Sequence, residues 1–311
     1  MIDLKSKRIT VTGGAGFLGT HLVKELRANG AKTVFVPQHP DYDFTKLEDC
    51  KKIAKDSDII IHLAAKVGGI GANMEHPGDF FYDNLMMGAQ LIEQARLNNV
   101  EKFVGIGTIC AYPKFTPVPF QEKDLWMGYP EETNAPYGLA KKMMLVQLQA
   151  YKKQYGFNGI YLLPVNLYGE GDNFNPNSSH VIPALIRKIH EAKLTNSKSV
   201  TVWGDGSASR EFLYVKDAAR GITLATMNYE KTEPVNLGSG MEITIKELVE
   251  LLCDIMDYHG EIIWDTSKPN GQPRRCLDIS LAEKEFKFRA KVPFREGLMN
   301  TIKWWENDRH S

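Results

Sequence analysis

The N-terminal segment Arg8-Ile9-Thr10-Val11-Thr12-Gly13-Gly14-Ala15-Gly16-Phe17-Leu18-Gly19 combines an apolar, β-branched run with three spaced glycines. The run predicts a buried parallel strand. The glycines at 13, 16 and 19 permit a tight turn, close approach of the backbone to a pyrophosphate, and close packing of the next helix on the strand. That helix continues through Leu22 and Leu26 to a stop at Asn29-Gly30, and its N-terminus favours a bound anion. Because another strand follows at 34–36, the order of elements predicts a dinucleotide-binding unit.

Strands and helices alternate through the rest of the first half of the chain. The predicted strands lie at 59–65, 103–107 and 159–163, and the predicted helices at 85–98 and 137–155. This alternation predicts an α/β fold with a doubly wound parallel Rossmann sheet, in which ligands bind beyond the carboxyl ends of the strands. Thr108 and Cys110 follow one strand, and Pro164, Asn166 and Leu167 follow another. We therefore expect these distant residues to share one crevice.

The composition changes after Gly169. Residues 170–179 form a polar loop that leads into a predicted helix over 180–190. We therefore expect a dinucleotide-binding Rossmann domain at 1–169 and, mainly, a smaller α/β substrate-binding lobe at 170–311.

Tyr137 and Lys141 lie four residues apart in a predicted helix, so their side chains share one face. A free phenol has a pKa of roughly 10, and a neighbouring ammonium favours the phenolate. Lys141 is thus expected to make Tyr137 usable as a general acid. A Tyr and a Lys at this spacing are also common surface residues, and it is the glycine loop that favours a catalytic pair.

The composition is typical of a soluble enzyme with a sizeable core. The 311 residues are 43% hydrophobic and carry a formal net charge of zero, which excludes a global attraction to nucleic acid or membrane. No apolar stretch reaches the roughly 18 residues of a membrane span, and we expect no signal peptide. The cysteines show no close pair and no metal-ligand spacing, which indicates a reducing cytoplasm and no metal site. They are Cys50, Cys110, Cys253 and Cys276.

Further motifs resemble those of the extended short-chain dehydrogenase/reductase superfamily of nucleotide-sugar enzymes. The matching blocks are Ala64-Ala65-Lys66-Val67-Gly68-Gly69-Ile70, Thr108-Ile109-Cys110-Ala111-Tyr112-Pro113, Tyr137 with Lys141, Asn166-Leu167-Tyr168-Gly169, Ser179-His180-Val181-Ile182-Pro183-Ala184-Leu185, Trp203-Gly204 and Arg210-Glu211-Phe212. They span almost the whole chain, and the blocks at 66–70 and 180–185 are much more specific than the glycine loop. The resemblance is to the branch that converts GDP-4-keto-6-deoxymannose to GDP-L-fucose, by epimerisation at carbons 3 and 5 and NADPH-dependent reduction at carbon 4. It also implies that a segment near 211–228 returns to the first domain.

The resemblance implies roles for five residues. Cys110 would be the base and His180 the acid of the epimerisation. Tyr137, with Lys141, would protonate the carbon 4 oxygen, to which Thr108 would donate a hydrogen bond. A thiol beside an activating partner and an imidazole both suit proton transfer near neutrality, although an isolated cysteine is more often a small buried hydrophobe. Thr108 stands where the family generally has serine, and it keeps the hydroxyl.

The resemblance also implies two sets of binding residues. The expected NADP(H) contacts are Gly13, Gly16, Phe17, Leu18, Gly19, His39, Leu63, Ala64, Ala65, Lys141, Pro164, Asn166, Leu167 and His180. The expected nucleotide-sugar contacts are Lys188, Trp203, Arg210, Asn270 and Arg275, among which the guanidinium groups suit a pyrophosphate.

Two departures from the family pattern leave alternatives open. Asn270 stands where an aspartate is expected, so the base and the sugar stay open. Ala15 and the segment 37–40 lack the arginines usual in NADP-preferring members, and no acidic residue stands at that strand end to hold NAD. NADP(H) is therefore expected from the resemblance, with NAD(H) as the alternative.

Other functions are compatible with the sequence. A GDP-deoxyheptose or GDP-colitose 4-ketoreductase or epimerase is the closest competitor, and an epimerase or dehydratase that recycles its cofactor would also keep Tyr137 and Lys141. A noncatalytic dinucleotide sensor would not need Cys110 with His180.

We also expect a homodimer through the helices at 85–98 and 137–155. The apolar residues offered to a partner or to the core are Met86, Met87, Leu91, Met144, Leu145 and Leu148.

Overall fold

A six-stranded parallel sheet forms the larger lobe of the computed structural model, which describes residues 1–68, 70–176, 178–268 and 270–308. From edge to edge the strands are β2 (Thr33–Phe35), β1 (Arg8–Thr12), β3 (Ile59–His62), β4 (Lys102–Ile106), β5 (Gly159–Pro164) and β9 (Val235–Leu237). Since β2 and β3 lie on opposite sides of β1, the glycine loop after β1 lies where the winding of the sheet reverses. The predicted doubly wound Rossmann sheet is confirmed.

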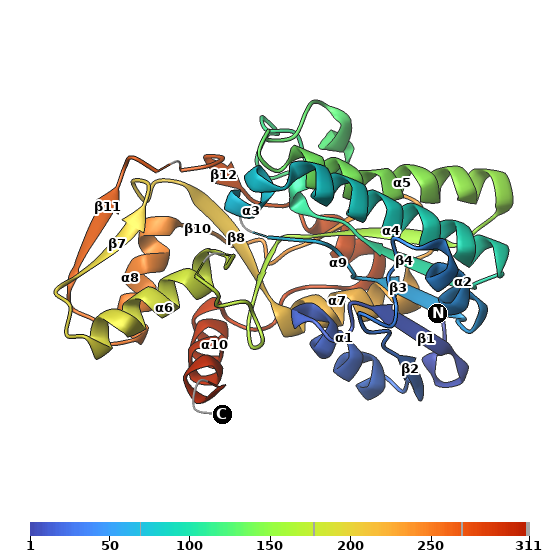
Figure 1. The fold of residues 1–311 in the computed structure, drawn as a ribbon, viewed down its shortest axis with the longest axis horizontal. Coiled ribbons are helices and arrows are strands. Elements are labelled where there is room, and N and C mark those ends of the chain that lie inside the picture. Colours follow the sequence, from blue (N-terminus) through green and yellow to red (C-terminus); the bar gives the residue numbers. More distant parts are fainter. Residues whose placement is uncertain (69, 177, 269, 309–311) are drawn as a thin grey trace.

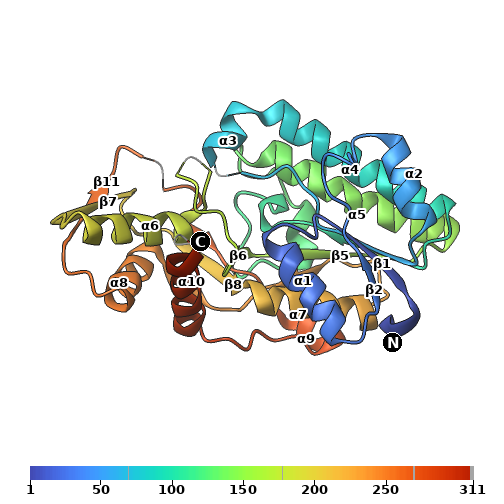
Figure 2. The ribbon, with the colours of Figure 1, turned by 60° about the horizontal axis from the view of Figure 1, so that its bottom comes forward.

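Helices cover both faces of this sheet, as Figures 1 and 2 show. The elements α1 (Phe17–Ala28) and α7 (Val215–Asn228) pack together on one face. The other face carries α2 (Leu47–Lys55), α4 (Pro77–Leu97) and α5 (Ala135–Tyr155), with the short α3 (Ile70–Glu75) before α4. The helix predicted from Leu85 begins earlier, because Pro77 is well suited to the first turn of a helix.

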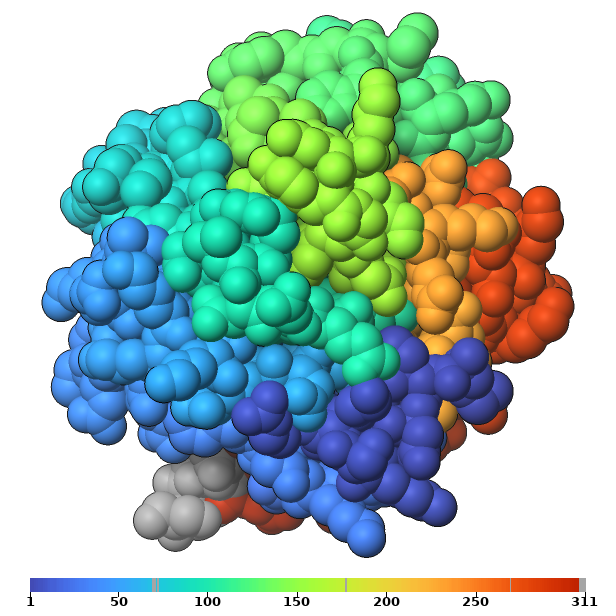
Figure 3. All heavy atoms as spheres, turned by 90° about the vertical axis from the view of Figure 1, so that its right-hand side faces the viewer, coloured from blue at the N-terminus to red at the C-terminus, as the bar shows by residue number. Residues whose placement is uncertain are grey.

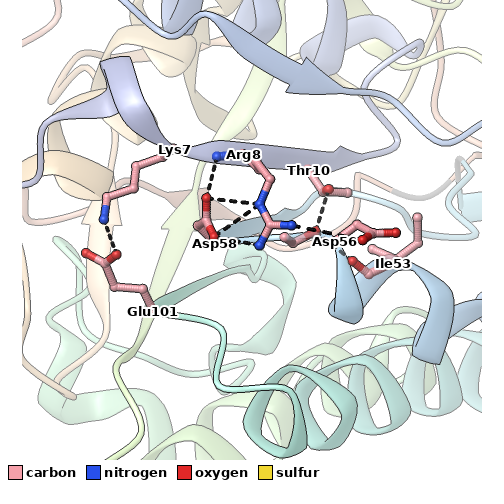
Figure 4. Close-up of polar contacts among 8 residues, drawn as sticks. Lys7, Arg8, Thr10, Ile53, Asp56, Asp58 and Glu101 are labelled. Carbon is pink, nitrogen blue, oxygen red and sulfur yellow. Dashed lines mark hydrogen bonds and ion pairs between the residues drawn. The ribbon is translucent and has the colours of Figure 1, made fainter.

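Polar contacts join neighbouring segments at the end of the larger lobe that faces away from the second lobe. In Figure 3 the segments near the N-terminus, near residue 100 and near residue 155 lie side by side at this end. Figure 4 shows Arg8 donating to Asp58 at 2.8 Å and Lys7 paired with Glu101. The 3-10 helix η1 (Leu4–Ser6) precedes these residues.

The second lobe is a smaller α/β unit with a core of its own, as predicted. The central strand β8 (Ser209–Tyr214) runs antiparallel to β10 (Glu242–Thr244) and parallel to β6 (Asn166–Tyr168) and β12 (Arg274–Arg275). A separate parallel pair joins β7 (Ser199–Trp203) to β11 (Glu261–Asp265). The surrounding helices are α6 (Val181–Leu194), α8 (Ile245–Ile255) and α10 (Phe294–Asp308).

The chain passes between the lobes more than once. Residues 211–214 belong to β8 in the sheet of the second lobe, whereas the helix that follows, α7, packs on α1. The strand β9 and the helix α9 (Ser280–Phe286) also pack with the larger lobe. The predicted boundary between two domains, at residues 169 and 170, stays a prediction.

Most of the apolar residues expected at a dimer interface are core residues instead. Leu91, Met144, Leu145 and Leu148 are at most 2% exposed, because they fill the space between α4, α5 and the sheet. This is the core packing that the sequence also allowed for these residues, so these four side chains are not available to a second copy. The exposed apolar side chains of the two helices are Phe81, Tyr82, Leu97, Val146 and Tyr155.

Candidate active site

The glycine loop presses against the end of β3 more tightly than any side chain would allow. A Cβ atom on Gly13, whose φ is +70°, would lie 2.9 Å from the backbone nitrogen of Ala64. On Gly19 it would lie 2.2 Å from the carbonyl oxygen of Gly13, so the first turn of α1 sits directly on the loop. This backbone cradle at a helix N-terminus fits a dinucleotide pyrophosphate. The predicted cofactor-binding residues that lie in or beside this glycine loop are Gly13, Gly16, Phe17, Leu18, Gly19, Leu63 and Ala64.

The remaining predicted cofactor residues lie at the carboxyl ends of the strands. His39 is exposed beyond β2, Ala65 follows β3, and Pro164 ends β5. Asn166 donates to the Glu211 carbonyl at 3.0 Å, which ties β6 to β8, and Leu167 follows it in the same strand. Gly69, from one of the specific motifs, lies outside the described residues.

Thr108, Cys110 and Tyr137 converge beyond the end of β4. Thr108 caps the 3-10 helix η2 (Ile109–Ala111), and its Oγ1 accepts from the Cys110 backbone N–H at 3.2 Å. Tyr137 lies in the first turn of α5 and shares a side-chain hydrogen bond with Thr108. The approach depends on Gly138, since a Cβ there would lie 2.4 Å from the Cys110 carbonyl oxygen.

Lys141 lies one helical turn beyond Tyr137 and is only 2% exposed. Its backbone carbonyl accepts from the Tyr161 hydroxyl at 2.9 Å. Burial lowers the pKa of Lys141 to about 7. Burial first, and then the nearby Cys110, raise the pKa of Tyr137, against the hydrogen bond from Thr108. Lys141 is not among the groups that shift the Tyr137 pKa in this structure, so the lowering of the Tyr137 pKa by Lys141 stays a prediction.

Cys110 is half-buried beside two guanidinium groups. Arg275 Nη1 lies 3.8 Å from the Cys110 Sγ, and Arg275 Nε donates to Gln272 Oε1 at 2.8 Å. Arg275 pairs with Arg210 in the parallel register of β12 and β8. Burial and then the charge of Arg275 lower the pKa of Arg210 to about 10, while Cys110 opposes this shift.

A fully buried carboxylate holds these strands in place. Glu211 accepts backbone N–H groups from Ser239 at 2.5 Å, Gly240 at 2.7 Å and Leu277 at 2.6 Å. It follows Arg210 directly, and Leu277 comes two residues after Arg275. Glu211 therefore fixes the two arginines relative to one another.

The predicted substrate residues form two groups. Arg210 donates to the carbonyls of Gln272 at 2.6 Å and Asn270 at 3.2 Å, and the Asn270 side chain accepts from the Asp205 N–H at 3.0 Å. Arg210, Asn270 and Arg275 thus lie together. Lys188 donates to the Thr201 carbonyl of β7, the strand that ends at the exposed Trp203. Among the described contacts, none joins this second group to the first.

His180 directly precedes α6. Its side chain reaches solvent, although many protein atoms lie around the imidazole. Burial lowers the pKa of its imidazole. No contact that the structure describes joins His180 to Cys110, so their pairing stays a prediction.

Sequence reasoning did not single out two buried polar residues, Gln272 and Asp172. Gln272 accepts a hydrogen bond from Arg275 and donates one to the Lys114 carbonyl at 2.8 Å. Its position in the sequence, between the predicted substrate residues Asn270 and Arg275, could have indicated this role. Asp172, in the polar loop before α6, is buried, and its Oδ2 has no partner among the described residues. Burial raises the Asp172 pKa to about 7. Nothing in the sequence distinguishes Asp172 from the other polar residues of that loop.

Two further observations concern the residues that the structure describes. There, no cluster of three or more histidine, cysteine or acidic side chains could hold a metal ion. No helix there is both long and apolar enough to cross a membrane.

The fold and the cluster around Tyr137 define a dinucleotide-dependent enzyme of the short-chain dehydrogenase/reductase type. Residues 9–238 match the NAD dependent epimerase/dehydratase family, and the chain belongs to that family. It is 41% identical over 304 residues, covering 97% of this chain and 92% of the relative, to probable GDP-L-fucose synthase 1 of Oryza sativa subsp. japonica. It is 33% identical to GDP-L-colitose synthase of Yersinia pseudotuberculosis, over 98% of this chain and 99% of that one. The resemblance inferred from the motifs is thereby confirmed.

A solved structure supports the same grouping. The GDP-L-fucose synthetase from Naegleria fowleri bound to NADP superposes with a TM-score of 0.90 at 27% identity, covering 99% of this chain and 95% of that chain.

Proposed function

We propose that this protein converts GDP-4-keto-6-deoxymannose to GDP-L-fucose, by epimerisation at carbons 3 and 5 followed by NADPH-dependent reduction at carbon 4. The observation that carries the proposal is the convergence of Thr108, Cys110 and Tyr137 at the carboxyl end of β4. One ketone placed there would meet a thiol beside its acidic carbons and two hydroxyls at its oxygen.

Reduction requires a proton for the carbon 4 oxygen. Tyr137 is suited to supply it, because burial keeps the phenol protonated at neutral pH. With substrate bound, Thr108 would turn its single hydroxyl proton from Tyr137 to the same oxygen and donate a second hydrogen bond there. Lys141, one turn away, would stabilise the phenolate that remains. When bound, the dinucleotide supplies the hydride.

Epimerisation requires a base on one face of the sugar and an acid on the other. The Cys110 thiolate would take the proton from the carbon beside the ketone, and the electron pair would move to the carbon 4 oxygen. His180 would then return a proton to the opposite face. Each inversion leaves a thiol and a neutral imidazole, which exchange protons with water before the next.

The glycine cradle fits a dinucleotide, and we assign NADP(H) with the residues predicted from the sequence. His39, exposed beyond β2, would face the 2′-phosphate. The substrate pyrophosphate would lie against Arg210 and Arg275, since paired guanidinium groups bind such oxygens well.

The test is incubation of the protein with GDP-4-keto-6-deoxymannose and either NADPH or NADH in deuterated water, followed by identification of the sugar. We expect GDP-L-fucose with deuterium at carbons 3 and 5, formed faster with NADPH. Unepimerised GDP-6-deoxy sugar without deuterium would show a simple 4-ketoreductase. Failure on this substrate but turnover of a GDP-4-keto-dideoxysugar or GDP-4-keto-heptose would move the assignment to the colitose or deoxyheptose type.

We also propose a cytoplasmic homodimer. The four cysteines are free thiols, as a reducing compartment allows. The exposed Phe81, Tyr82 and Val146 give α4 and α5 an apolar surface that a second copy would cover. Sedimentation at micromolar concentration should give the mass of two chains, and Tyr82→Glu should shift it toward one. A single-chain mass for the unaltered protein would contradict the dimer.

A further inference from the structure

We infer that Arg275 is the counter-ion of a Cys110 thiolate and that Gln272 holds it in that position. Arg275 is then a positioning residue that acts through Cys110, in addition to any contact with the substrate pyrophosphate. This inference rests on the proposed function, because it names the activating partner of the proposed base.

The geometry around the sulfur supports this role. The Nη1 of Arg275 lies 3.8 Å from Sγ, within reach of an N–H···S hydrogen bond. The titratable or charged groups that face the thiol are Tyr137 from α5, Arg210 from β8 and Arg275 from β12. None of the ion pairs among the described residues includes either arginine; the neighbouring Arg274 pairs with Glu242 instead.

Gln272 links the guanidinium of Arg275 by hydrogen bonds to the segment that carries Cys110. Its Oε1 accepts from Arg275 Nε at 2.8 Å, and its Nε2 donates to the Lys114 carbonyl at 2.8 Å. Gln272 is only 7% exposed, so both bonds are sheltered from water. Lys114 comes four residues after Cys110, and the same segment is joined to the chain beyond Arg275 by Phe120 N–H donating to the Cys276 carbonyl at 2.8 Å.

A charged partner has a direct use in the proposed epimerisation. A thiolate, and not a thiol, takes a proton from carbon. The guanidinium of Arg275, 3.8 Å from the sulfur, would stabilise the thiolate electrostatically before the substrate arrives. When Cys110 takes the proton, the negative charge moves to the carbon 4 oxygen, which faces Thr108 and Tyr137.

The test is the rate of Cys110 alkylation by iodoacetamide as a function of pH, measured on the full chain without substrate by mass spectrometry of the Cys110 peptide. We expect Arg275→Met to slow alkylation several-fold at pH 7 and to approach the unaltered rate at high pH, because the thiolate is the reactive form and loses its charged neighbour. Arg275→Lys should retain part of the effect. Gln272→Leu should lower the rate several-fold with Arg275 still present.

Arg274→Met is the matched control. Arg274 is the adjacent residue, and its guanidinium pairs with Glu242 at 2.6 Å instead of facing Cys110. Its alkylation profile should match that of the unaltered protein. An Arg275→Met profile with an unchanged inflection, whether equally fast or uniformly slower, would overturn the inference. This assay uses no substrate, so it tests the role of Arg275 separately from the proposed function. The alkylation result can contradict the inference while the unaltered protein still takes up deuterium into the sugar. Equally, the alkylation result can support the inference while the protein takes up none.

Discussion

Gly138 lies against the backbone of Cys110 so closely that a Cβ atom on residue 138 would be 2.4 Å from the Cys110 carbonyl oxygen. The two residues belong to different elements, α5 and η2. Because Tyr137 precedes this glycine and Thr108 caps η2, the contact sets the distance between the proposed proton donor and its partner hydroxyl.

The first prediction is that Gly138→Ala impairs both folding and catalysis. The added methyl meets backbone atoms, which cannot rotate away as a side chain would, so we expect a loss of about 1–3 kcal/mol in the free energy of unfolding. A shift of about 1 Å in the active site should lower kcat/KM by tenfold or more. Urea unfolding and NADPH oxidation measure the two effects. Gly78→Ala in α4, where a Cβ meets open space, should lose neither; a fully active Gly138→Ala enzyme would show that this contact does not set the site.

The second prediction is that Tyr137→Phe removes the reduction and keeps substrate binding. The change deletes one hydroxyl and little volume, and loss of a general acid typically costs 10²–10⁴-fold in rate. Single-turnover NADPH oxidation should fall by that order, while the affinity for the GDP-sugar, measured by calorimetry, should change little. Tyr155→Phe, at the exposed end of α5, is the control. An undiminished reduction rate in Tyr137→Phe would rule out Tyr137 as the acid.

The glycine loop, the alternating elements and the residues after the strand ends were predictable, because each depends on local sequence. Parallel strands place their carboxyl ends at one edge, so Thr108 and Tyr137 follow once the fold is given. The neighbours of Cys110 were not predictable in the same way. Arg275 reaches it through β12, a strand of two residues that pairs with β8 and whose register depends on the buried Glu211. No periodicity marks so short a strand.

The ionisation of the paired residues also escaped the sequence. A spacing of four places Tyr137 and Lys141 on one face, but it does not show how deeply the helix is buried. In the structure, desolvation raises the pKa of Tyr137 and lowers the pKa of Lys141, so it favours the neutral form of each group.

The third prediction follows from the Lys141 pKa, which burial lowers from 10.5 to about 7. Between pH 7 and about 10 the unfolded chain holds a proton on this lysine that the folded chain lacks, so raising the pH through this range stabilises the fold at this site. Lys141→Met has no such group. We expect the variant to melt a few degrees above the unaltered, ligand-free protein at pH 6–7, and the difference to shrink as the pH rises to 10. Lys152→Met, near the exposed end of α5, should show no such trend. A constant difference across this range would contradict the burial argument.

The last prediction separates the two halves of the proposed reaction at Cys110. Cys110→Ser replaces a thiol with an alcohol that ionises far less readily, so proton removal beside the ketone should slow by several orders of magnitude. The hydroxyls of Tyr137 and Thr108 are untouched, so the carbon 4 oxygen can still be protonated. Given the unepimerised keto sugar and NADPH in deuterated water, the variant should lose deuterium uptake at carbons 3 and 5 and should reduce the substrate to the unepimerised 6-deoxy sugar. His180→Asn, which removes the proton donor proposed for the opposite face, should retain partial uptake at most, and Cys253→Ser in the second lobe is the matched control. If Cys110→Ser exchanged both hydrogens at the unaltered rate, Cys110 would not be the base and a simple 4-ketoreductase would account better for the site.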